Sequence, residues 1–94
     1  MENIEGWKLE QIKAVIVKLM EIMTIQERRR LYRFAVAVIL WDNPEKHAEY
    51  IKEGYPPIEQ TITRTRQLLA SATYQQAVKI AAWQRAILRA RKKE

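Results

Sequence analysis

The side chains that carry out most enzyme chemistry are scarce in this sequence. Its 94 residues include one histidine, His47, one serine, Ser71, and no cysteine. A serine hydrolase would have to pair those two residues, yet no nucleophile-elbow sequence surrounds the serine. Glu45 and Glu49 each lie two residues from His47, on other sides of a helix, so they form no metal-binding face with it. Because a glycine-rich phosphate loop is also missing, we predict a protein that is not an enzyme and has no catalytic residue, cofactor or metal.

Positive charge is the most informative feature of the sequence. Seventeen Lys and Arg against eleven Asp and Glu give a net charge of +6. The excess lies in residues 24–41 and 57–94, whereas residues 1–23 and 42–56 are slightly acidic. Clustered cations release counterions when they dock on phosphates, so nucleic acid is the partner that we expect. The predicted phosphate contacts are Arg28, Arg29, Arg30, Arg85, Arg89, Arg91, Lys92 and Lys93.

The consecutive arginines Arg28 to Arg30 stand where a helix disfavours positive charge. They occupy the first turn of an expected helix, whose N-terminal end is already positive. Their position indicates an outside reason, either an anion bound at that helix start or acids from another segment. The C-terminal cluster has a simpler alternative, since exposed helix faces and the negative C-terminal end of a helix both favour cations. An acidic row at Glu45, Glu49 and Glu53 also allows head-to-tail contact with the basic segment of another copy.

Apolar residues spaced by three and four predict helices along most of the chain. Leu9, Ile12 and Ile16 begin such a stripe near the N-terminus. The patterns Thr-x-x-Glu at Thr24 and Thr-x-x-Gln at Thr73 are capping boxes, each of which starts a helix. The expected helices span residues 7–23, 25–41, 44–53, 57–70 and 74–91, with a frayed basic C-terminus. One long helix over 57–91 is the alternative to a break near residues 71–73.

The stretch ERRRLYRFAVAVILWDNP, residues 27–44, changes character along its length. After the cations it becomes apolar all round, so its helix is expected in the middle of a bundle or at an interface between copies. Trp41 continues one apolar stripe of this helix and is therefore predicted to contact the core or another subunit. The apolar run from Phe34 to Trp41 is too short to cross a bilayer, which takes about 20 residues.

Together these elements predict an all-α, single-domain protein, a small bundle of four to five helices without strands. Acids precede the apolar residues in the N-terminal MENIEGWKLEQ, the reverse of a secretory signal. The lack of cysteine is compatible with a reducing compartment. We therefore expect a cytoplasmic protein with no membrane span.

Two functions of different classes fit this sequence. The charge layout favours a non-enzymatic basic protein that binds DNA or RNA through phosphate contacts, self-associated as a dimer or larger homo-oligomer. The alternative is a protein–protein interaction module, or a structural assembly subunit, that uses its apolar helix faces without nucleic acid. The sequence does not distinguish DNA from RNA or from another polyanion.

Overall fold

The computed structural model describes residues 6–91 and confirms the all-α prediction. Five α-helices and one short 3₁₀-helix follow one another without a strand in the described range. They are α1 (Leu9–Met20), α2 (Ile25–Ile39), α3 (Pro44–Glu53), η1 (Ile58–Gln60), α4 (Thr61–Leu69) and α5 (Tyr74–Ala90).

Side-chain caps fix where helices begin, as at α2 and α5. At α2 the Thr24 hydroxyl accepts from the Glu27 N–H while the Glu27 carboxylate accepts from the Thr24 N–H, the reciprocal pair of a capping box. Thr73 and Gln76 repeat this arrangement at α5. The chain therefore breaks between α4 and α5, and residues 57–91 do not form one long helix.

The observed helices are shorter than expected at several ends. α1 ends at Met20 rather than residue 23, because the N–H groups of Ile22 and Met23 bond to carbonyls three residues back and tighten the last turn. That turn leaves Thr24 extended, as a helix N-cap requires. Likewise α2 ends at Ile39, and the fourth helix opens as η1 before it becomes α4.

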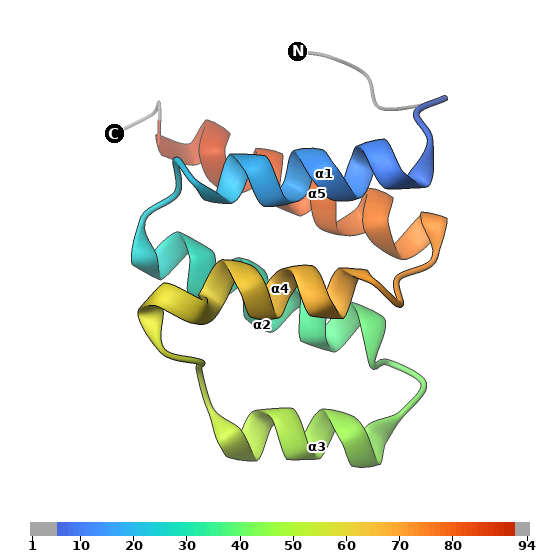
Figure 1. Ribbon diagram of the computed structural model, residues 1–94, viewed down its shortest axis with the longest axis vertical. Coiled ribbons are helices and arrows are strands. Elements are labelled where there is room, and N and C mark those ends of the chain that lie inside the picture. Colours follow the sequence, from blue (N-terminus) through green and yellow to red (C-terminus); the bar gives the residue numbers. More distant parts are fainter. Residues whose placement is uncertain (1–5, 92–94) are drawn as a thin grey trace.

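Four of the helices pack as two layers around one core. α1 and α4 form one layer and α5 and α2 the other, and α5 contacts both α1 and α2 (Figure 1). Helices α1 and α2, although consecutive, lie diagonally across this arrangement. Helix α3 stands apart beside α2 and contributes no buried side chain.

The core is apolar except at a few points. Its largest fully buried apolar side chains are Ile12, Ile16, Met20, Leu31, Leu69, Ile80 and Val36. Each aliphatic side chain of this size contributes roughly 1.5–3 kcal/mol by leaving water. Gln84 is also fully buried, and its Nε2 donates to the Ile16 carbonyl at 2.9 Å, which ties α5 to α1. Its Oε1 is buried with no hydrogen-bond partner among the described residues.

Candidate nucleic-acid interface

The arginines predicted as one group, Arg28 to Arg30, point to three different places. Arg28 turns back to the end of α1, where its Nε donates to the Met20 carbonyl at 2.7 Å and an Nη to the Glu21 carbonyl at 3.2 Å. The last carbonyls of a helix lack partners and carry negative partial charge. A cation in the first turn of α2 is thus tolerated because it caps the negative end of α1. The sequence predicts a bound anion or an acid from another segment as the reason for cations at this helix start. For Arg28 the reason is instead the end of a neighbouring helix, α1.

Arg91 is held by the fold in a similar way. Its guanidinium makes a two-pronged pair with the Glu27 carboxylate, with Nε 2.8 Å from Oε2 and an Nη on Oε1, and also donates to the Ile22 carbonyl at 2.8 Å. The hydrogen bonds from Arg91 lower the pKa of Glu27 from 4.5 to about 2, although burial acts in the opposite direction. The same contact raises the pKa of Arg91. This pair joins the end of α5 to the start of α2, so Arg91 is already neutralised.

Arg29 lies against the ring of Tyr55, a residue that follows α3 in the chain, whereas Arg28 bonds to the end of α1. The Arg29 guanidinium carbon is 5.0 Å from the centre of the Tyr55 ring, and that of Arg33, one turn further along α2, is 4.9 Å from it. Cation–π attraction of this kind orients a guanidinium without neutralising it. Within residues 6–91 no carboxylate forms an ion pair with either arginine. The Nε of Arg29 is buried and has no hydrogen-bond partner in the same range.

Arg30 is exposed and lies on the flank of α2 that faces α5. Together Arg29, Arg30 and Arg33 cover the outer side of the first half of α2, and we call them the α2 arginine stripe. Arg33 was missed in the sequence, although its spacing of three and four from the other two would have revealed it. Tyr55 had no sequence signal, because its position beside α2 depends on how the chain folds back after α3.

The remaining predicted cations do not join this stripe. Arg85 is half-buried and Arg89 exposed on α5. At 100° per residue, Arg85 sits roughly 200° round α5 from Trp83, the residue that faces α2. Lys92 and Lys93 lie outside the described residues. The structure therefore brings Arg29 together with Arg33 at the Tyr55 ring, and places Arg30 beside the hollow that Arg91 also borders.

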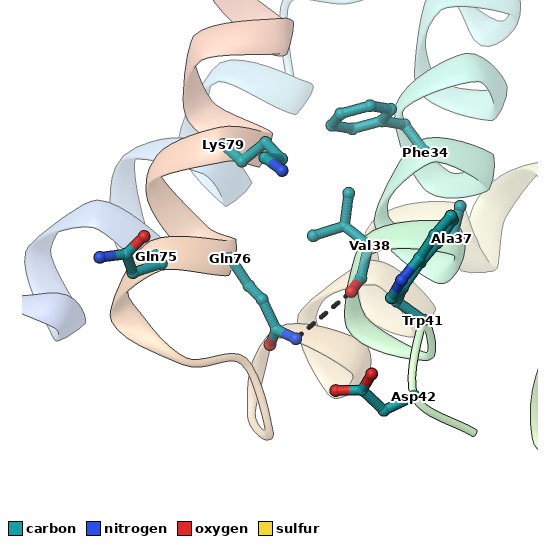
Figure 2. Close-up of a pocket in the computed structure, with 8 residues that line it drawn as sticks. All are labelled: Phe34, Ala37, Val38, Trp41, Asp42, Gln75, Gln76 and Lys79. Carbon is teal, nitrogen blue, oxygen red and sulfur yellow. Dashed lines mark hydrogen bonds between the residues drawn. The ribbon is translucent and has the colours of Figure 1, made fainter.

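An apolar furrow runs between α2 and α5, beside the stripe. At its centre the rings of Phe34 and Trp83 stack with centroids 4.6 Å apart and planes 7° apart. One hollow lies at the Trp41 end, where Val38 of α2 and Trp41, just beyond the end of that helix, lie across from Lys79 and Gln76 of α5 (Figure 2). A second hollow lies beyond the ring pair, at the end of the furrow that Arg30 and Arg91 border.

Of the two alternatives predicted for Trp41, contact with the core or with another subunit, the structure excludes the core. Its side chain is 81% exposed, so it is not part of the core. Helix α2 has ended at Ile39, and the α5 residues at this level are Gln75 and Gln76, which offer the indole no apolar cover. Contact between Trp41 and another subunit stays a prediction.

Across residues 6–91 no three His, Cys, Asp or Glu side chains gather in a way that would hold a metal ion. Nor does this part of the chain contain a helix long and apolar enough to cross a membrane. Comparison with protein-family models, curated proteins and solved structures gave no match.

Proposed function

We propose that this protein is a non-enzymatic nucleic-acid-binding protein that contacts phosphates through the α2 arginine stripe. The observation that carries the proposal is the pair of guanidiniums, Arg29 and Arg33, held on one Tyr55 ring without an ion-pair partner among the described residues. Both lie about 5 Å from the same ring centre and stand at i and i+4 on α2, a spacing at which like charges repel each other. A chain of phosphates relieves that repulsion and releases its own counterions.

The ring under the arginines supports the same proposal. Tyr55 is 43% exposed, which leaves part of its aromatic surface open to a base as well as to the two cations. Stacking on aromatic side chains beside positive charge is how single strands are bound with little sequence preference. The proposal therefore favours single-stranded nucleic acid over duplex. Arg28 and Arg91 are left out of the phosphate-contacting set, because both are bonded within the fold.

Fluorescence anisotropy with labelled single-stranded DNA, single-stranded RNA and duplex DNA tests the proposal. The variant Arg29→Gln with Arg33→Gln removes two charges from the stripe. Its control, Lys18→Gln with Arg66→Gln, removes two charges from exposed residues that line the furrow between α1 and α4. We expect the stripe variant to weaken binding at least about fivefold at low salt and the control to change it far less. Equal losses in both variants, or no binding of any probe at low salt, would overturn the proposal.

We keep the second candidate, a protein–protein interaction module, because of one specific observation. Trp41 is exposed at one end of the furrow, where the Gln76 side chain crosses from α5 to the Val38 carbonyl, and the partly buried ring pair Phe34–Trp83 lies at its centre. Exposed aromatic side chains on an apolar surface are typical of protein interfaces. This function and nucleic-acid binding are compatible, since the stripe and the floor of the furrow are different surfaces of α2. A cytoplasmic setting belongs to both proposals and is supported by the cysteine-free sequence.

A further inference from the structure

The furrow between α2 and α5 has two different ends. At one end stand the exposed indole of Trp41 and the carboxylate of Asp42. At the other end Arg30 borders a hollow whose floor includes Trp83, Ala86 and Ile87. One end thus presents a large apolar side chain and an acid, with Lys79 across the furrow from them. The other end presents a hollow bordered by Arg30 and by the paired Glu27 and Arg91.

The two ends come together when a second copy is rotated by 180°, so that the two furrows face each other in antiparallel orientation. Arg30 lies in the first half of α2, and Asp42 lies three residues beyond the end of that helix at Ile39. A two-fold axis through the middle of the furrow, near the Phe34–Trp83 ring pair, brings each end of one copy onto the opposite end of the other. Trp41 then faces the partner's hollow, and Asp42 approaches the partner's Arg30. Each contact occurs twice, as an isologous interface requires.

We infer that the occupant of the furrow is a second copy of this chain, docked antiparallel, with Trp41 of each copy in the hollow beside Arg30 of the other. The alanine at position 86 leaves room in that hollow, and the flat side of Trp83 offers an aromatic contact. An acidic helix from another protein fits less well, because Asp42 stands at one end of the furrow and would repel it. A typical stable interface buries about 800 Å² per partner, roughly an eighth of the 6468 Å² surface of the protomer.

This inference is independent of nucleic-acid binding and adds a geometry to it. In the dimer Arg30 turns to the partner, so the phosphate contacts of the α2 arginine stripe fall to Arg29 and Arg33, which stay beside Tyr55, outside the furrow. A dimer of this form carries two arginine pairs, one on each side of the interface. Linked sites of this kind raise the apparent affinity for a long polyanion without any new contact.

Sedimentation equilibrium of the full chain, without nucleic acid, from micromolar to millimolar concentration tests the dimer. Trp41→Ala is expected to weaken dimerisation at least about 30-fold, as for an interface hot spot, while its unfolding temperature stays unchanged because the indole is exposed. Arg30→Asp alone and Asp42→Arg alone should each weaken dimerisation about tenfold or more. The double variant Arg30→Asp with Asp42→Arg exchanges the two charges and should return to within about threefold of the original constant.

The charge exchange distinguishes this arrangement from any other use of the furrow. Recovery in the double variant requires residues 30 and 42 to meet across the interface. A monomer at all concentrations, an unchanged constant for Trp41→Ala, or a double variant weaker than either single variant would each overturn the inference. All variants are checked by circular dichroism, so that loss of the fold is not read as loss of the dimer.

Discussion

Replacing Glu27 with glutamine removes the negative charge that joins the start of α2 to Arg91 at the end of α5. Glutamine at this position still completes the capping box with Thr24, because its carbonyl accepts from the same N–H. What disappears is the negative charge that receives the two hydrogen bonds of Arg91. Any loss of stability in Glu27→Gln therefore measures the negative charge of Glu27, chiefly through its pair with Arg91 and to a smaller extent through its hydrogen bonds with Thr24.

The size of that loss follows from the pKa of Glu27. A pKa of about 2 in the folded protein against 4.5 in the unfolded chain corresponds to at most about 3–4 kcal/mol at neutral pH. The carboxylate side chain is 12% exposed but the Arg91 side chain is 38% exposed, so solvent screens part of the interaction. We expect Glu27→Gln to lower the free energy of unfolding by about 1.5–2 kcal/mol at pH 7. For a domain of this size that corresponds to a decrease in the unfolding temperature of roughly 10 °C.

The lowered pKa of Glu27 determines how its contribution to stability changes with pH. Because folding lowers the pKa of Glu27, its stabilisation is fully present above pH 4.5 and is lost as the pH falls toward 2. The difference in free energy of unfolding between the original protein and Glu27→Gln should therefore be constant above pH 5 and shrink between pH 4.5 and pH 2. It is measured by urea unfolding followed by circular dichroism at 222 nm. Glu49→Gln, at an exposed acid on α3, is the control and should change stability by less than about 0.5 kcal/mol. A difference that is absent at pH 7, or that does not change with acid, would refute this account of the pair.

Three further changes separate structural from functional residues. Arg28→Met should lower the free energy of unfolding by about 1–2 kcal/mol, measured by urea unfolding, and leave oligonucleotide affinity within about twofold, because its guanidinium caps α1; a large loss of affinity would contradict this assignment. Tyr55→Leu should weaken oligonucleotide binding about threefold or more in anisotropy titrations with little change in stability, since it removes the ring under two arginines, and unchanged affinity would argue against the stripe. Gln84→Ala should cost about 2–4 kcal/mol by leaving a cavity, whereas Gln84→Met should lie within about 1 kcal/mol of the original, because it also removes the unpartnered Oε1; equal losses in thermal unfolding would contradict that distinction.

The helices could be predicted from the sequence because their signals are local. A capping box needs only residues three apart, so the starts of α2 and α5 follow from Thr24 and Thr73. The ends were less predictable. Nothing in the apolar spacing of α1 shows that the chain tightens after Met20 to place Thr24.

The site was only partly predictable, because its contacts join residues far apart in the sequence. The arginine run predicts a site in this segment of the chain, but Tyr55, whose ring lies against Arg29 and not against Arg28, comes 26 positions after Arg29. Arg91 and Glu27 are 64 positions apart. Cations that look alike in sequence thus take different roles, because the fold decides whether each one meets a helix end, a carboxylate or a ring.

The central claim is that the outer side of α2 carries the nucleic-acid contact, and the most direct test is to observe the arginine side chains during binding. Nuclear magnetic resonance of the Arg Nε–Hε groups, titrated with a short single-stranded oligonucleotide, reports each guanidinium separately. The account predicts that the signals of Arg29 and Arg33 shift in proportion to binding while those of Arg28 and Arg91 do not move. Shifts confined to Arg85 and Arg89, or spread evenly over all arginines, would contradict it.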